Sequence, residues 1–257
     1  MNLVLGAGSG MGEAVARAIA GRGDLLVADK NSDAVATLAA SLGPQVTAIA
    51  CDVCAEADVA ALAARVDRLD ALIITAGLSP SMARGRPIFE VNLRGMAAVL
   101  DALDGAVGEG TAAVCFASIA GHGHDHPPEL LAVLDDPLSA DFFDRLERVG
   151  VDVDEPGMAY MLSKYGVIRL VRRLSKAWGP RGARIVSLSP GIIDTPMGEL
   201  EFEHMPVMKE MVAGSPLGRQ GRAEEVGAVA AFLSSPAASF VTGCDVLVDG
   251  GWSASLS

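Results

Sequence analysis

A tyrosine and a lysine four residues apart, Tyr160 and Lys164, have the spacing needed for proton transfer. They lie near the start of an apolar, helix-compatible run from Met158 to Trp178, and positions i and i+4 share one helix face. An ammonium beside a phenol stabilises the phenolate, so the tyrosine becomes a workable acid and base closer to neutral pH. The same spacing is also typical of a helix with a half-buried tyrosine and a lysine whose stem covers apolar surface.

A glycine-rich turn follows a short apolar stretch at the start of the chain. Residues 2–5 are predicted to form a strand, and a helix is predicted to run from the turn to about Ala20. The pattern G-x-G-x-x-G fails here, whereas G-x-x-x-G-x-G fits. Backbone N–H groups and the helix dipole at such a turn bind a pyrophosphate, although a turn of this kind also occurs without a ligand. The predicted cofactor contacts in the turn are Gly6, Ser9, Gly10, Met11 and Gly12.

An acidic residue ends the second predicted strand, Leu25 to Ala28. This residue, Asp29, stands 23 positions after Gly6, where a carboxylate accepts hydrogen bonds from the ribose hydroxyls of an adenosine. A carboxylate there repels a 2′-phosphate, which favours NAD over NADP, and Lys30 weakens this preference. Asp29 is also a candidate N-cap for the helix predicted over 32–42, and both roles can hold.

Small or polar residues stand directly after the later predicted strands. These strands are expected at 46–50, 69–75, 112–117, 184–188 and 245–248. Ligands bind at the carboxyl ends of the strands in a parallel sheet. Asn92 falls on the apolar face of a helix predicted over 83–103, and an asparagine there needs a hydrogen-bonding partner when it is buried. The residues after the strands are Asp52, Val53, Ala76, Gly77, Ser118, Pro190 and Gly191.

Seven predicted strands alternate with helices along the chain. This alternation predicts an α/β fold with a Rossmann-type, doubly wound, seven-stranded parallel sheet in three α/β/α layers. We expect one domain over residues 1–257. An insert of about 121–157 interrupts the pattern before the helix of Tyr160, and residues 125–155 contain ten acids against Arg145 and Arg148. We expect this insert to emerge at the mouth of the site, as a functional or mobile segment.

Two clusters leave alternatives open. Three histidines beside Asp125 resemble a metal site, but their spacing is not that of a helical pair, and we expect a solvated loop and no metal. A methionine-rich segment is either a mobile lid over a lipophilic substrate or an amphipathic helix packed on the body. The histidines are His122, His124 and His126, and the methionines are Met197, Met205, Met208 and Met211.

The net charge of −12 argues against nucleic acid and anionic membranes as partners. No apolar run reaches the roughly 18 residues that span a bilayer, and the start of the chain does not resemble a signal peptide. Four scattered cysteines are too few for a disulfide scaffold, which indicates a reducing, cytoplasmic setting. Cys51 and Cys54 have the spacing of a redox pair, but with no second pair nearby we expect a structural role.

Taken in order, these motifs resemble the short-chain dehydrogenase/reductase family over nearly the whole chain. The residues that carry the resemblance are Gly6, Gly10, Gly12, Asp52, Val53, Ala76, Gly77, Asn92, Ser118, Tyr160, Lys164, Pro190, Gly191 and Thr195, with the Asp-Gly-Gly ending at 249–251.

The resemblance implies roles for these residues. Tyr160 is expected to be the acid and base at the substrate oxygen, and Ser118 to hold that oxygen by a hydrogen bond. Lys164 is expected to bind the nicotinamide ribose and to lower the pKa of Tyr160, and Asn92 to help hold a proton path through water. The expected contacts are Asp52 and Val53 with the adenine, and Ile193 and Thr195 with the nicotinamide amide. The implied reaction is hydride transfer between a nicotinamide and a carbon that bears a hydroxyl or carbonyl.

The chain departs from the family pattern in three places. Leu5 and Thr75 replace the usual Thr and Asn near the glycine turn, and the insert is the third departure. The insert, the short connection from Gly77 to Asn92 and the overall length are similar to the bacterial 3α-hydroxysteroid dehydrogenase/carbonyl reductase branch. This similarity implies a lipophilic, alicyclic or steroid-like alcohol or ketone as the substrate.

The family usually forms tetramers, partly through the helix of Tyr160. We therefore expect a homo-oligomer, and a dimer if the insert covers that helix. Two other functions remain open: a dinucleotide-sensing protein without turnover, and a biosynthetic reductase of a ketoacyl or sugar substrate. The intact set Asn92, Ser118, Tyr160 and Lys164 favours an enzyme over a sensor.

Overall fold

A parallel sheet of seven strands forms the centre of the structure, a computed structural model that describes residues 1–123 and 125–256. The strand order is β3-β2-β1-β4-β5-β6-β9, and every neighbouring pair is parallel. The order reverses beside β1, which is the kind of position where ligands bind in such sheets. The strands are β1 (Asn2–Leu5), β2 (Leu25–Asp29), β3 (Val46–Ala50), β4 (Ala71–Ile74), β5 (Ala112–Phe116), β6 (Arg184–Pro190) and β9 (Asp245–Val248).

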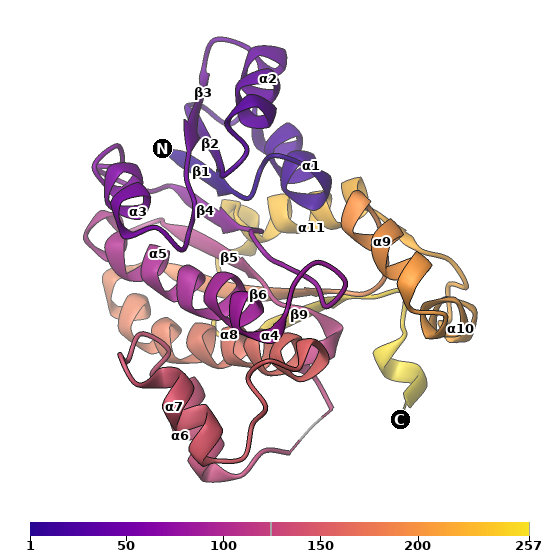
Figure 1. The fold of residues 1–257 in the computed structure, drawn as a ribbon. Coiled ribbons are helices and arrows are strands. Elements are labelled where there is room, and N and C mark those ends of the chain that lie inside the picture. The colour runs from indigo at the N-terminus through magenta and orange to yellow at the C-terminus, as the bar shows by residue number, and fades with distance from the viewer. Residues whose placement is uncertain (124, 257) are drawn as a thin grey trace.

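Helices cover both faces of the sheet (Figure 1). One face packs against α1 (Gly10–Ile19), α2 (Ser32–Leu42) and α11 (Ala223–Leu233). The other packs against α3 (Glu56–Ala63), α5 (Met96–Ala102) and α8 (Pro156–Trp178). Because both faces are covered, β1, β4 and β5 are buried along their whole length, which explains their continuous apolar sequences. The predicted three-layer Rossmann-type fold is confirmed.

Local sequence signals explain where the main helices begin. The side chain of Asn31 accepts a hydrogen bond from the Ala34 N–H and caps α2, so the predicted capping role of Asp29 is wrong. Asp29 instead turns back toward the glycine-rich turn. Helix α8 begins with Pro156 at its first position, and Glu155 accepts hydrogen bonds from the first N–H groups.

The helix predicted over 83–103 is present but not regular. It consists of α4 (Gly85–Phe89), a π-helical segment η1 (Glu90–Gly95) and α5. Asn92 lies in the π-helical segment and is fully buried. Its Oδ1 accepts from the Leu78 N–H at 2.7 Å and its Nδ2 donates to the Leu78 carbonyl at 2.9 Å. The partner that a buried asparagine requires is therefore the backbone after β4, and π-helical turns are frequent at functional sites.

The acidic insert forms two short helices, α6 (Pro128–Leu134) and α7 (Phe142–Arg148), which lie against α4 and α8 (Figure 1). Arg169 of α8 donates from Nε and Nη2 to the two carboxylate oxygens of Asp135, and Phe142 packs edge-on against Phe89 at 5.9 Å between ring centroids. Within the described part of the chain, residues 122–157 line neither cavity of the cleft described below. The expectation that the insert lies at the mouth of the site is wrong, because its apolar side chains pack on the outer surface of α4 and α8.

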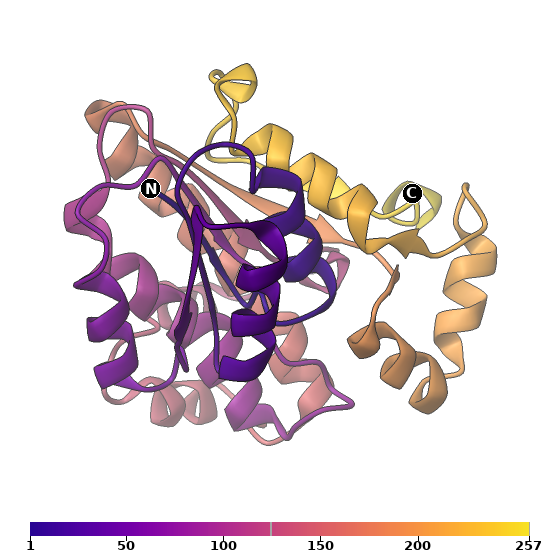
Figure 2. The same ribbon diagram turned by 90° about the horizontal axis from the view of Figure 1, so that it is seen from above.

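The methionine-rich segment forms α9 (Pro196–His204) and α10 (Val207–Gly214), drawn in orange in Figure 2 beside the body of the sheet. A two-stranded ladder of β7 (Ile193–Asp194) and β8 (Gly221–Arg222) joins both ends of this segment to the body. The structure shows two helices in this segment, and α9 lies at the cleft. None of the helices in the described ranges is both long and apolar enough to cross a bilayer.

Candidate active site

Two adjoining cavities lie at the carboxyl ends of β1, β4, β5 and β6. The glycine-loop cavity has a volume of about 330 Å³ and extends over the glycine-rich turn to Asp29 and Asp52. The tyrosine cavity has a volume of about 70 Å³ and contains Ser118 and Tyr160. The two cavities share part of their lining, which makes them one continuous cleft. The shared residues are Met11, Thr75, Gly77, Leu78, Thr195 and Met197.

The glycine-rich turn is shaped by close backbone contacts. Gly6 and Gly10 have φ angles of 86° and 55°, a region that side chains disfavour. A Cβ at Gly12 would lie 1.9 Å from the Gly6 carbonyl oxygen, so only glycine fits there. Ser9 caps α1 without a side-chain hydrogen bond, which leaves the first N–H groups of the helix available. These N–H groups, together with the helix dipole, fit a bound pyrophosphate.

Asp29 stands at the far end of the glycine-loop cavity. Its Oδ2 accepts a hydrogen bond from the Gly8 N–H at 3.0 Å, and its Oδ1 accepts from the Asn31 N–H at 2.9 Å. A Cβ at Gly8 would lie 2.8 Å from the Asp29 Cγ, so the turn and the carboxylate are in close contact. Lys30 lines the same cavity.

Thr75 supports the turn from the next strand. Its hydroxyl lies 2.9 Å from the Leu5 carbonyl oxygen and 3.0 Å from the Gly6 carbonyl oxygen. The Leu5 and Gly6 carbonyl oxygens share the hydroxyl proton of Thr75, which ties the turn to the end of β4. Four other predicted contacts, Asp52, Val53, Ala76 and Gly77, also line the glycine-loop cavity.

Tyr160 and Lys164 point from one face of α8 into the tyrosine cavity, as their spacing predicts. The Lys164 Nζ lies 5.8 Å from the Tyr160 ring centroid and donates to the Phe116 carbonyl at 3.1 Å. A Cβ at Gly77 would lie 3.3 Å from the Asn92 Oδ1 and 3.5 Å from the Lys164 Nζ. Asn92 lines neither cavity and contacts the backbone around Leu78 from behind.

The pKa values of the pair differ from the expectation. Burial and the charge of Glu201 raise the pKa of Tyr160 to about 12, and the nearby Ser118 hydroxyl lowers it in part. Burial lowers the pKa of Lys164 to about 8. The raised pKa of Tyr160 is opposite in direction to the lowering expected from Lys164. The phenol is therefore protonated at neutral pH.

The segment after β6 completes the cleft. Pro190, Gly191, Ile193 and Thr195 all line the tyrosine cavity. The Thr195 Oγ1 accepts from the Gly198 N–H at 3.1 Å and so caps α9. A Cβ at Gly10 would lie 3.4 Å from the Thr195 side chain, so the start of α9 rests against the glycine-rich turn.

The sequence patterns missed part of the lining contributed by α9. Met197, Leu200 and Glu201 follow the spacing i, i+3, i+4, and all three line the cleft. This spacing was the signal that could have placed Glu201 on the apolar face of its helix. Burial raises the pKa of Glu201, and the adjacent Ser79 hydroxyl partly opposes this shift.

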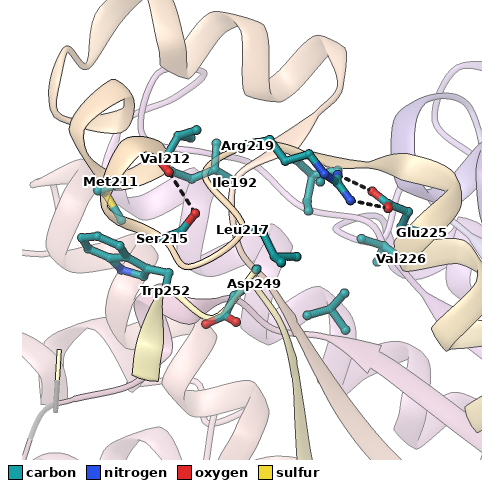
Figure 3. Close-up of a pocket in the computed structure, with 14 residues that line it drawn as sticks. Ile192, Met211, Val212, Ser215, Leu217, Arg219, Glu225, Val226, Asp249 and Trp252 are labelled. Carbon is teal, nitrogen blue, oxygen red and sulfur yellow. Dashed lines mark hydrogen bonds and ion pairs between the residues drawn. The ribbon is translucent and has the colours of Figure 1, made fainter. Parts of the chain in front are cut away.

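A separate cavity lies on the other side of the segment 192–193 and has a volume of about 140 Å³ (Figure 3). Trp252 and Met211 stand together at one end, and the ion pair between Arg219 and Glu225 lies at the other, with nitrogen and oxygen 2.7 Å apart. None of the predicted catalytic residues lines this cavity. The cleft is therefore the better candidate for the active site.

Among the residues that the structure describes, the histidine and cysteine clusters form no second reactive centre. The His122 Nε2 lies 2.9 Å from the Asp245 Oδ2 and anchors the start of the insert to the edge strand β9. His124 lies outside the described residues. Burial and nearby carboxylates raise the pKa of Cys51 and of Cys54 to about 11, so both thiols are protonated at neutral pH. Within residues 1–123 and 125–256, no group of three His, Cys, Asp or Glu side chains is arranged to hold a metal.

Two family models match most of the chain between them. Residues 1–124 match a family model described as short chain dehydrogenase, and residues 148–253 match one described as enoyl-(acyl carrier protein) reductase. The residues between these two matches belong to the insert. A solved short-chain dehydrogenase/reductase of Brucella melitensis, named as a glucose/ribitol dehydrogenase, superposes with a TM-score of 0.77 at 27% identity and covers 97% of this chain and 95% of its own.

Three curated relatives extend over most of the chain. A short-chain dehydrogenase/reductase of Alternaria brassicicola is 33% identical over 99% of this chain and 96% of its own length. The cis-4-hydroxycyclohexanecarboxylate dehydrogenase of Sinomonas cyclohexanicum is 33% identical over 98% of this chain and 96% of its own length. The 3-alpha-hydroxysteroid dehydrogenase/carbonyl reductase of Comamonas testosteroni is 32% identical over 71% and 72%. The protein belongs to the short-chain dehydrogenase/reductase family of oxidoreductases, which bind a nicotinamide dinucleotide.

Proposed function

We propose that this protein is an NAD-dependent oxidoreductase that interconverts a secondary alcohol and a ketone, with Tyr160 as the acid and base. The observation that carries the proposal is the convergence of Tyr160, Ser118 and Lys164 on one small cavity. That cavity opens onto a glycine-rich turn with free helix N–H groups, where a dinucleotide fits. The bound nicotinamide supplies the hydride chemistry, and the protein supplies orientation and proton transfer.

The proposed proton transfer follows from the protonation states of the site. The pKa of Tyr160 is raised to about 12, so its phenol holds a proton at neutral pH and donates it to a ketone oxygen during reduction. Ser118 donates a hydrogen bond to the same oxygen and fixes its position. In the alcohol direction the phenol must first lose its proton, so oxidation is favoured by alkaline pH.

Lys164 and Asn92 have supporting roles in this proposal. Lys164 is buried and lines the tyrosine cavity, where its ammonium would bind the ribose hydroxyls of a bound nicotinamide. Asn92 holds the backbone of Leu78 through two hydrogen bonds and stands close to Lys164 beside Gly77. We propose that it fixes the strand end and holds the water through which the proton leaves.

The remaining cofactor contacts follow the cleft outward. We propose that the glycine-rich turn binds the pyrophosphate and that Asp52 and Val53 contact the adenine, since they line the same cavity. Ile193 and Thr195 would meet the nicotinamide amide from the tyrosine cavity. Asp29 would accept hydrogen bonds from the adenosine ribose and disfavour a 2′-phosphate, which supports NAD over NADP.

The substrate is proposed to be a lipophilic, alicyclic alcohol or ketone. Apolar side chains of the tyrosine cavity support this proposal, among them Leu78, Ile192 and Met197. One relative is named cis-4-hydroxycyclohexanecarboxylate dehydrogenase, and the substrate in that name is an alicyclic alcohol. A steroid-like substrate is supported by the 3-alpha-hydroxysteroid dehydrogenase/carbonyl reductase, which matches 71% of this chain.

We further propose a homodimer as the assembled state. The insert covers the outer face of α4 and α8, which removes that face as a contact surface. The edge strand β9, α11 and the connection between them carry three exposed apolar side chains, which is typical of an interaction surface. Phe240 is fully exposed, and Phe232 and Leu247 have exposed fractions of 49% and 43%. A light-scattering mass of one chain, or a dimer unaffected by Phe240→Ser, would contradict this proposal.

We also propose that residues 1–257 form a single dinucleotide-binding domain and that the protein works in a reducing, cytoplasmic setting. The first proposal is supported by β9, which returns from the end of the chain to pair with β6 in the same sheet. The second is supported by the four free thiols, two of them exposed.

The experiment that tests the proposed activity combines binding and turnover. NADH and NADPH are titrated by fluorescence, and each is then tested with a panel of cyclic ketones and alcohols that includes steroids. Tighter binding of NADH, together with turnover of an alicyclic panel member, is the expected result. Tighter binding of NADPH would overturn the cofactor proposal. NADH binding without turnover of any panel member would contradict the proposed activity.

A further inference from the structure

One carboxyl stands in the tyrosine cavity beside the proposed catalytic phenol. Helix α9 places it there, because its N-cap Thr195 rests on the glycine-rich turn and its apolar face turns into the cleft. Met197 and Glu201, one turn apart on that face, both line the tyrosine cavity. Among the described residues that line this cavity, Glu201 is the one that carries a carboxyl.

Glu201 is half-buried in this cavity and forms no ion pair with a Lys or Arg among the described residues. Burial raises its pKa, and the Ser79 hydroxyl lowers it in part. Its charge also raises the pKa of Tyr160, so the two groups interact across the cavity. A carboxyl in an apolar cavity is costly unless it accepts hydrogen bonds, and a ligand can supply the donor.

The location of Glu201 sets which part of a ligand it meets. In the proposed complex Ser118 and Tyr160 hold the reacting oxygen, and Glu201 lines the same cavity from a separate helix, α9. Glu201 would therefore meet a part of the substrate other than the reacting carbon. A substrate that fills the cavity therefore presents a second group to Glu201.

We propose that Glu201 determines the substrate specificity of this site by accepting a hydrogen bond from a donor on the substrate ring, either a hydroxyl or an ammonium. The same carboxyl disfavours a substrate that carries its own carboxylate at that position, because like charges repel in a cavity of low polarity. This inference rests on the proposed alcohol and ketone chemistry and names the class of substrate for it. A site built to bind a donor discriminates strongly against the analogue that lacks it.

The test uses four matched cyclohexanols that differ only at ring position four. They are cyclohexanol, cis-cyclohexane-1,4-diol, cis-4-aminocyclohexanol and cis-4-hydroxycyclohexanecarboxylate. For the wild type with NAD, we expect kcat/KM for the diol and the amino alcohol to exceed that for cyclohexanol by about tenfold or more. We expect the carboxylate to be the poorest of the four substrates.

Two substitutions then separate the two kinds of donor. Glu201→Leu removes the acceptor. The kcat/KM values for the diol and for the amino alcohol, each divided by that for cyclohexanol, should therefore both fall to about one. Glu201→Gln keeps a carbonyl oxygen without the charge, so it should retain the preference for the diol and lose that for the amino alcohol. In Glu201→Gln the ratio of kcat/KM for the carboxylate to that for cyclohexanol should rise about tenfold over the wild type. Glu203→Leu changes an exposed carboxyl on the same helix and should leave every ratio unchanged.

Two results overturn the inference while the proposed activity stands. One is turnover of all four alcohols by the wild type with no preference among them. The other is a preference that Glu201→Leu leaves intact, with NADH affinity and thermal midpoint equal to those of the wild type. A wild type that binds NADH and oxidises none of the four contradicts the proposed activity and this inference with it.

Discussion

The carboxylate of Asp29 accepts a hydrogen bond from the Gly8 N–H, with 3.0 Å between Oδ2 and the nitrogen. The residue that is proposed to select the cofactor therefore also holds the turn that is proposed to bind the pyrophosphate. Its second oxygen accepts from the Asn31 N–H at 2.9 Å, and each carboxylate oxygen has a further lone pair for a ribose hydroxyl.

Asp29→Ala should therefore change both selectivity and affinity. Loss of the charge removes the repulsion of a 2′-phosphate, so the ratio of the NADPH to the NADH dissociation constant should fall by about tenfold or more. Loss of the hydrogen bond to Gly8 should weaken NADH binding as well. Fluorescence titrations of both cofactors measure these effects. Asp33→Ala, at an exposed position in the first turn of α2, is the control. An unchanged ratio in Asp29→Ala would limit this residue to supporting the turn.

Gly12→Ala should destabilise the protein and weaken dinucleotide binding. The added Cβ would lie 1.9 Å from the Gly6 carbonyl oxygen and 2.5 Å from the Thr75 hydroxyl, and the backbone must move to make room. Such overpacking costs about 1–3 kcal/mol of unfolding free energy. Gly21→Ala, where the added Cβ meets nothing within 4 Å, should have a small effect. Equal midpoints of the two variants in urea would show that the turn is not packed as described.

Thr75→Val should weaken the same turn without adding bulk. The variant loses the hydroxyl that binds the Leu5 and Gly6 carbonyls, at an expected cost of about 1–2 kcal/mol of stability. NADH affinity should decrease with it, because the turn would no longer be held in its binding shape. Thr47→Val, at an exposed position on β3, is the control for the loss of a threonine hydroxyl. If Thr75→Val bound NADH as tightly as the wild type, the support from Thr75 would have no part in binding.

The lowered pKa of Lys164 gives a pH dependence of stability with a defined sign. Its folded-state pKa is about 8 against 10.5 when unfolded, so between these values the unfolded chain binds more protons. Stability therefore rises with pH in this window, and the penalty of burying the charge is fully present below it. The unfolding free energy of the wild type relative to Lys164→Met should increase between pH 8 and 10, by an amount on the order of 3 kcal/mol. A difference that stayed constant with pH would contradict the burial of a charged Lys164.

Much of the fold could be predicted from the sequence because its signals are local. The alternation of short apolar strands with helices, together with the glycine-rich turn, predicted the sheet and the place of the cleft. The bounds of β3 and α2 agree with the prediction to the residue. The spacing of Tyr160 and Lys164 placed both side chains in one cavity.

The features that could not be predicted depend on contacts between distant segments. The sequence predicts the insert as a functional or mobile segment at the mouth of the site. Instead Asp135 pairs with Arg169 and Phe142 packs against Phe89, so the insert docks on the outer helices. The π-helical turn at Asn92 depends on the Leu78 backbone, which lies on another segment. The raised pKa of Tyr160 depends first on burial and then on the charge of Glu201, and both arise only in the folded chain.

The central claim is that Tyr160 transfers the proton, and Tyr160→Phe tests it most directly. The variant keeps the ring and loses the hydroxyl, so turnover of an alicyclic ketone with NADH should fall by about 10²–10⁴-fold while NADH affinity is retained. Tyr165→Phe is the matched control, because Tyr165 lies on the same helix with its ring against His126 at 4.8 Å between centroids. Loss of turnover in Tyr160→Phe alone is the predicted result. Turnover by Tyr160→Phe close to that of the wild type would contradict the mechanism.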